Sequence, residues 1–159
     1  MKKRIILFTI TLLIMGFILT YYFVELDNIP QSEAAAPSFW SLSPTTRLMA
    51  RTIHAEARGE PFVGQVAVGA VIMNRVHSAK FPNSISGVIY QPWAFTAVAY
   101  GHIWNHTPSS TSVRAAISAL SGWDPTYNSI YYYNPAGVST YWIYSRQVVR
   151  RIGKHIFAR

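Results

Sequence analysis

The sequence contains no cysteine, which excludes disulfide bonds, thiolate zinc sites and a cysteine nucleophile. Acidic side chains are scarce as well: six Asp and Glu residues stand against fourteen Lys and Arg residues, and the formal net charge is +8. Only Glu56, Glu60 and Asp124 lie downstream of Ala36. Such a surplus of positive charge indicates attraction to a polyanion, for example nucleic acid, anionic lipid or an anionic cell envelope.

Several motifs of common enzyme classes are also absent. The sequence has no phosphate-binding glycine loop and no nucleophile-elbow motif, which disfavours nucleotide hydrolysis and Ser-His-Asp chemistry. His102 and His106 have metal-ligand spacing only if the segment between them is helical, and no third ligand is evident. The sequence therefore predicts neither a metal centre nor a cofactor.

The N-terminus carries a long uncharged run. Residues 5–24 have no charged side chain and follow the basic residues Lys2, Lys3 and Arg4; the run is long enough to span a bilayer as a helix. The basic flank should stay in the cytoplasm, which places the rest of the chain outside. Small residues permit signal cleavage after Ala34, so the segment is either a secretion signal or an uncleaved membrane anchor. Both alternatives predict an exported protein and disfavour nucleic acid as its partner.

The organisation that follows is one exported domain. We assign residues 1–36 to the signal or anchor with its linker, and residues 37–159 to a catalytic domain. The patterns predict an α+β, helix-rich fold with a small β component. The expected elements are helices over 44–58, 61–76 and 111–122, a short amphipathic element over 85–91, a strand or bend over 93–98, a strand over 129–134 and short strands within 141–157. Residues 25–43 are expected to be an irregular linker.

Glu56 occupies an unusual position in the first predicted helix. Ser43 and Pro44 suit the helix start, and Gly59 suits its end. At 100° per residue, Glu56 falls within the apolar stripe of Leu48, Met49 and Ile53, opposite a cationic face of Arg47, Arg51, His54 and Arg58. A carboxyl group held against apolar side chains has its pKa raised, which would keep the acid protonated near neutral pH. The alternative is a buried structural glutamate bonded to backbone donors.

The other two acids have structural explanations. Glu60 precedes Pro61 at the start of the second predicted helix, where negative charge is favoured by the helix dipole. Asp124, in "GWDPT", is typical of an Asp-Pro turn. We therefore expect Glu60 to cap a helix and Asp124 to build a turn.

Aromatic side chains cluster in segments interrupted by Gly and Pro. Together with Asn134 and Arg146, some of them suit a groove that stacks on sugar rings and bonds their hydroxyl and amide groups. The aromatic residues in question are Trp93, Phe95, Tyr131, Tyr132, Tyr133, Tyr141, Trp142 and Tyr144.

These motifs together resemble the SleB/CwlJ cell-wall hydrolase family. The resemblance rests on "ARTIHAEARGEPFVGQVAVGAVIMNRV", "FPNSISGVIYQPWAFTAV", "GWDPT", "YYYNP", "WIYSR" and "IGKHIF", in this order over residues 45–159. It implies a lysozyme-like, mainly helical domain that acts on peptidoglycan glycan strands. It also implies that Glu56, in the first half of "AEARGE", is the catalytic acid. A role in spore germination is implied by the family alone.

The preferred hypothesis is a lytic transglycosylase that acts at the bond between N-acetylmuramic acid and N-acetylglucosamine, because that reaction needs one carboxyl group for both proton transfers. A muramidase-type hydrolase would need a second carboxylate, and an N-acetylmuramoyl-L-alanine amidase would normally need metal ligands. A non-catalytic wall-binding protein is the remaining alternative. The residues expected to bind substrate are Phe95, Thr96, Tyr132, Tyr133, Asn134, Trp142, Ser145 and Arg146.

Overall fold

The computed structural model describes Met15, residues 36–138 and residues 141–159. All the elements below belong to one compact unit, Ala35–Arg159. Apart from Met15, the predicted signal or anchor over residues 5–24 lies outside the described residues. Within the part of the chain that is described, no helix is both long and apolar enough to cross a membrane.

Three helices form the main layer of the domain: α2 (Pro44–Ala57), α3 (Phe62–Val76) and α6 (Ser110–Leu120) pack against one another. All three were predicted. The Ser43 hydroxyl accepts a hydrogen bond from the Thr46 N–H, at 3.1 Å, and so caps α2 as expected. Helix α3 is buried along most of its length, which agrees with its nearly continuous apolar sequence.

Small residues allow these helices to approach closely. A Cβ atom added at Gly69 of α3 would lie 2.7 Å from the Ala119 Cβ of α6 and 2.9 Å from the Ile53 Cδ1 of α2. Only glycine fits at position 69, because the neighbouring helices leave no room for a side chain. Helix α2 ends at Ala57 with Arg58 as its C-cap, so it stops before Gly59 as expected. Gly59 does not have a positive φ.

Short helical segments connect the main elements: η1 (Phe39–Ser41), α4 (Ile85–Ile89), α5 (Thr96–Ala99), η2 (His102–Trp104) and η3 (Tyr141–Ser145). Two expectations are corrected here. The segment 93–98 was expected to be a strand or bend, but its second half begins α5. The expected linker is also partly ordered, because Phe39 of η1 is buried in the main hydrophobic core. An aromatic side chain that can reach the core orders the chain ahead of α2.

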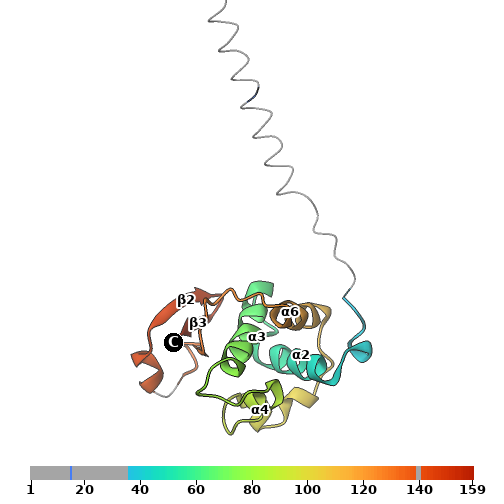
Figure 1. Cartoon of the computed structure of the whole chain (residues 1–159), viewed down its shortest axis with the longest axis horizontal. Coiled ribbons are helices and arrows are strands. Elements are labelled where there is room, and N and C mark those ends of the chain that lie inside the picture. Colours follow the sequence, from blue (N-terminus) through green and yellow to red (C-terminus); the bar gives the residue numbers. More distant parts are fainter. Residues whose placement is uncertain (1–14, 16–35, 139–140) are drawn as a thin grey trace, which may run out of the picture. The chain divides into compact units, whose positions relative to one another are not determined.

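A small antiparallel sheet completes the domain. It consists of β1 (Tyr131–Tyr133), β2 (Val148–Ile152) and β3 (His155–Ala158), in the order β1-β3-β2. Tyr132 pairs with Phe157 in the register of β1 and β3. The strand predicted over 129–134 and the short strands predicted around the Arg150–Arg151 pair are confirmed. Figure 1 shows the sheet at one end of the helical layer and residues 36–43 at the other.

Candidate functional site

Glu56 lies in the last turn of α2, and its side chain is half-buried. Two hydrogen bonds hold the carboxylate. The Ala97 N–H of α5 donates to Oε1 at 2.9 Å, and the Tyr132 hydroxyl of β1 donates to Oε2 at 3.0 Å. Each oxygen is thus oriented by a different element of the fold, and the carboxyl group is held at one position.

The Glu56 carboxyl group lies in the wall of a cavity of about 270 Å³. Five of the predicted substrate-binding residues (Phe95, Thr96, Tyr132, Tyr133 and Asn134) line the same cavity. Its other lining residues are Arg75, Ala94, Gly137, Val138 and His155. The helical layer supplies the carboxyl group, and the sheet with the loops around α5 supplies the rest of the wall.

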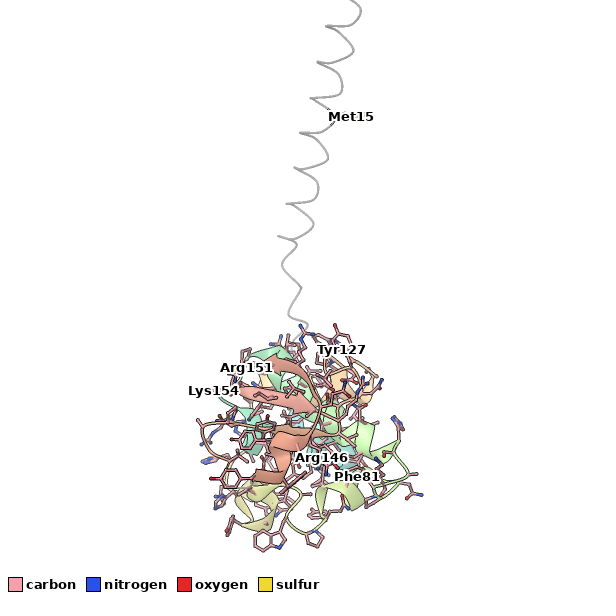
Figure 2. All side chains as sticks on the ribbon, turned by 90° about the vertical axis from the view of Figure 1, so that its left-hand side faces the viewer. Met15, Phe81, Tyr127, Arg146, Arg151 and Lys154 are labelled. Carbon is pink, nitrogen blue, oxygen red and sulfur yellow. The ribbon has the colours of Figure 1, made fainter. Side chains whose placement is uncertain are left out.

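The remaining predicted binding residues, Trp142, Ser145 and Arg146, do not line this cavity. The Arg146 guanidinium lies over the rings of Tyr131 and Trp142, at 5.0 and 5.2 Å from their centroids. The Ser145 hydroxyl donates to the Trp142 carbonyl at 2.8 Å. Phe81, labelled with Arg146 in Figure 2, also contacts the Tyr131 ring, with centroids 6.5 Å apart. These residues form a separate aromatic and cationic cluster on η3.

The alternation of side chains along β1 explains this separation. Successive strand residues point to opposite faces of a sheet. Tyr132 faces Glu56, whereas Tyr131 contacts Trp142, with ring centroids 5.6 Å apart. The sequence motif "YYY" does not reveal which tyrosine meets the acid, because the pairing with β3 decides it.

Tyr132 is fixed by its neighbours on three sides. Its ring lies 6.0 Å from Phe157, 5.1 Å from His155 and 6.5 Å from Phe95, measured between centroids. Burial, followed by the neighbouring Glu56 carboxylate, raises the pKa of Tyr132 well above its usual value. Tyr132 therefore keeps its proton over the physiological pH range and remains a hydrogen-bond donor to Glu56.

Two ionisable residues are among the cavity residues that the sequence reasoning missed. Arg75 of α3 is buried, donates from Nε to the Ile130 carbonyl at 2.8 Å, and lies over the Phe95 ring. His155 of β3 is also buried, and within the described residues its Nδ1 atom has no hydrogen-bond partner. The sequence contained an indication of each. Arg75 is the only charged residue in a largely apolar helix, and His155 shares one face of its strand with Phe157.

Burial is the main influence on the protonation of His155. It lowers the pKa of this imidazole, an effect that the Glu60 and Glu56 carboxylates oppose and Lys154 reinforces. The ring therefore faces the cavity as a neutral group near pH 7, able to donate or accept a hydrogen bond.

The other two acids take structural positions outside this cavity. Glu60 accepts a hydrogen bond from the Lys154 N–H at 2.9 Å, in the β2–β3 turn. It is therefore structural, but the predicted helix cap is wrong: Pro61 is the N-cap of α3 and no side chain bonds there. Asp124 accepts from the backbone N–H groups of Thr126 and Asn128, at 2.7 Å each, which confirms the predicted turn.

The two histidines with ligand spacing do not lie on an α-helix. His102 begins the 3₁₀ segment η2, and His106 lies beyond its end. Across residues 36–138 and 141–159, no three His, Asp or Glu side chains are grouped so that they could hold a metal ion. His102 and His106 would have metal-ligand spacing only on one continuous helix, and they do not share one.

The cavity thus combines one carboxyl group with aromatic, amide and imidazole side chains. A hydrogen-bonded carboxyl group in a cavity with aromatic and polar side chains is suited to bind a ligand and to transfer a proton to it. Fold and site together define a helix-rich domain with such a cavity.

The chain belongs to the cell wall hydrolase family, whose model matches residues 59–158. It is 54% identical over 113 residues to a spore cortex-lytic enzyme of Bacillus cereus, covering 71% of this chain and 43% of that protein. It is also 34% identical to the cell wall hydrolase CwlJ of Bacillus subtilis, covering 69% of this chain and 81% of that protein. The family match begins at residue 59 and does not include Glu56.

A solved structure shows the same fold. The catalytic domain of the germination-specific lytic transglycosylase SleB from Bacillus anthracis aligns with a TM-score of 0.70 and 51% sequence identity. The alignment covers 75% of this chain and 98% of that domain. The chain spans less than half the length of the spore cortex-lytic enzymes it matches, but nearly all of this one catalytic domain.

Proposed function

We propose that this domain cleaves peptidoglycan glycan strands as a lytic transglycosylase, with Glu56 as its acid and base. The observation that carries the proposal is the single carboxyl group in the cavity, held by the Ala97 N–H and the Tyr132 hydroxyl. The similarity to a domain described as a lytic transglycosylase, over nearly its whole length, supports the reaction type.

In the proposed reaction, the Glu56 carboxyl group donates its proton to the glycosidic oxygen as the bond to the muramic acid C1 breaks. The carboxylate then removes the proton of the C6 hydroxyl of the same sugar, and the C6 oxygen bonds to C1. The products are a 1,6-anhydro end and a new sugar hydroxyl, and no water is consumed. The Tyr132 and Ala97 donors stabilise the carboxylate that exists between the two proton transfers.

A hydrolase of the muramidase type would require a second carboxylate near the scissile bond. The two candidates are Glu60 and Asp124, and both are bonded into turns outside the lining of the Glu56 cavity. An amidase would be expected to show a cluster of metal ligands, which the described residues do not contain. The geometry therefore favours the one-carboxyl reaction over both alternatives.

The cellular setting is part of the same proposal. The names of the relatives indicate the spore cortex as the substrate and germination as the process. The basic flank and the uncharged run over residues 5–24 indicate export, with a membrane anchor if the segment is not cleaved. The proposal also includes the lysozyme-like character of the helical layer, which the family resemblance implies.

The test is digestion of purified peptidoglycan by the wild type and by Glu56→Gln, followed by mass spectrometry of the fragments. We expect Glu56→Gln to lower the cleavage rate at least roughly 100-fold, because it removes the proton donor. The wild-type products should be anhydro ends, each lighter by one water than a reducing end. The matched control is Glu60→Gln, which should retain most of the activity.

The outcomes separate the alternatives. Reducing ends alone would replace the transglycosylase by a hydrolase, and release of free peptides from intact glycan would indicate an amidase. Wall digestion that survives the Glu56→Gln substitution would refute the catalytic role of Glu56.

A further inference from the structure

The domain has a second, larger cavity away from Glu56. Its volume is about 410 Å³, against about 270 Å³ for the Glu56 cavity. It is formed by η1, the first half of α2, and the residues Tyr90 and Trp104. We call it the η1–α2 cavity; neither the proposed reaction nor the sequence-based expectations assign it a role.

The η1–α2 cavity lies toward the N-terminal end of α2, whereas Glu56 lies in the last turn of this helix. Arg47, which lines the cavity, precedes Glu56 by nine residues, and nine steps of about 100° place these two side chains about 180° apart around the helix axis. Figure 1 agrees: residues 36–43 lie at the end of the helical layer away from the sheet that carries Tyr132 and His155. The two cavities are therefore separate sites.

One arginine builds the cavity wall. Arg51 donates hydrogen bonds to the backbone carbonyls of Ile103 and His106, at 3.2 and 3.1 Å. Its guanidinium also lies over the rings of Phe39 and Trp104, at 4.9 and 5.1 Å from their centroids. These contacts tie η1 and η2 to α2, so the hollow is held open by the fold.

The large aromatic side chains around the cavity are mostly exposed. Trp40, Tyr90 and Trp104 are 65%, 51% and 58% exposed. Exposed aromatic side chains of this size around a hollow indicate a binding site. The Arg47 side chain makes no hydrogen bond or ion pair with any residue in the described part of the chain, and it lies in the first turn of α2, where the helix dipole also favours a negative charge.

We propose that the η1–α2 cavity binds a second peptidoglycan strand, distinct from the one being cleaved. Aromatic rings stack on the apolar faces of pyranose rings, and a guanidinium binds a carboxylate. The ligand class is therefore an N-acetylated sugar with a carboxylate on it or on its attached peptide. The inference rests on the proposed function in one respect only: the proposed function supplies peptidoglycan as the class of ligand.

The concave shape favours a strand over a lipid surface. An interfacial membrane anchor presents apolar side chains that project into the headgroup region, whereas Trp40, Tyr90 and Trp104 surround a hollow. Binding of a neighbouring strand would hold the enzyme on an insoluble network between cleavage events and would raise the local concentration of substrate at Glu56.

The test is co-sedimentation of the full-length Glu56→Gln protein, in mild detergent, with insoluble peptidoglycan. Adding Trp40→Ala and Arg47→Gln should raise the dissociation constant roughly tenfold, since a stacking contact and a charged hydrogen bond are lost. Tyr90→Ala, outside η1 and α2, provides an independent variant. The matched controls Trp123→Ala and Arg58→Gln make the same changes outside this cavity and should leave binding nearly unchanged.

Two further arms identify the ligand. On peptidoglycan whose carboxylates have been converted to amides, Arg47→Gln should no longer matter, whereas Trp40→Ala should. With Glu56 restored, the cavity variants should cleave short soluble glycan fragments at the wild-type rate. The inference would be overturned if the cavity variants bound the wall as tightly as the parent protein. It would also be overturned if these variants lost binding to anionic phospholipid vesicles and kept their binding to the wall. The two proposals can be tested separately. If the proposed function is wrong, the Glu56→Gln protein will still cleave peptidoglycan; if this inference is wrong, the cavity variants will bind the wall like the parent protein.

Discussion

At the scale of single residues, the important contact is the one between Tyr132 and Glu56. The tyrosine hydroxyl is the only side-chain donor that bonds this carboxylate within the described residues. Its raised pKa means that it stays protonated, and so remains a donor, near neutral pH. Tyr132 is therefore expected to position the acid and to stabilise its ionised form during the reaction.

Tyr132→Phe tests this role. The ring keeps its packing on Phe157 and His155, while the charged hydrogen bond is lost, so we expect kcat to fall roughly 10- to 100-fold. Steady-state kinetics on soluble glycan fragments measure it, with Tyr131→Phe on the opposite strand face as the control. An unchanged kcat would contradict the assignment.

Asp124 is a residue whose charge stabilises the fold. Burial raises its pKa, but hydrogen bonds from Thr126, Asn128 and Asn74 outweigh burial, and the net direction is downward. A carboxyl group with a lowered pKa in the folded state contributes stability above about pH 4, and this contribution is lost as the pH falls through the folded-state pKa.

Asp124→Asn should therefore lower the free energy of unfolding by about 1–3 kcal/mol at pH 7, because one acceptor is lost and an amide donor faces backbone N–H groups. The difference from the wild type should shrink below about pH 4. Urea unfolding at the two pH values measures it. Thr126→Val, which removes one donor and keeps the carboxylate, should have a smaller effect; a difference independent of pH would argue against the carboxylate.

At the scale of the elements, the crossing of α2, α3 and α6 determines where Glu56 is presented. Gly69 lies at this crossing, and the atom nearest to an added Cβ is the Ala119 Cβ, which cannot move without its backbone. The packing is therefore tight where the helix that carries the acid meets the central helix.

Gly69→Ala should destabilise the domain by about 1–3 kcal/mol, since overpacking outweighs the helix propensity gained with alanine. Thermal and urea unfolding measure the change. Gly59→Ala is the matched control: no atom lies within 4 Å of the added Cβ and φ is not positive, so stability should be unchanged or slightly higher. Equal stability of the two variants would show that the crossing tolerates a methyl group.

At the scale of the whole molecule, positive charge dominates the surface. The residues after Ala36 include eleven basic and three acidic side chains. Figure 2 shows Arg151 and Lys154 close together at the sheet end, apart from Arg146. A long-range field of this sign attracts an anionic wall and is screened by salt.

Binding of the Glu56→Gln protein to insoluble peptidoglycan should therefore weaken as ionic strength rises from about 0.05 to about 0.5 M, because the screening length falls from roughly 14 Å to roughly 4 Å. Co-sedimentation measures it. The double variant Arg151→Gln and Lys154→Gln should bind more weakly at low salt and depend less on salt. An affinity independent of salt would mean that the contacts are mainly uncharged.

Local patterns in the sequence were sufficient to predict most of the elements. The apolar stripe of α2, the small and apolar composition of α3 and the run of tyrosines in β1 each predict one element, because helices and strands need a particular period. The same stripe placed Glu56 on the buried face of α2. Segment 93–98 and residues 39–41 were assigned wrongly, since short segments adopt the conformation that their tertiary contacts favour.

The sequence by itself determined that Glu56 is the candidate acid, because helix phase depends on neighbouring residues and the scarcity of carboxylates depends on composition alone. Only the tertiary structure decided what surrounds that acid. Ala97, Tyr132 and His155 come from segments 41 to 99 positions further along the chain. Strand register brought Tyr132 to the cavity, whereas Trp142 and Arg146 lie outside it, against Tyr131. Contacts between distant segments depend on how the whole chain packs, and no local pattern encodes them.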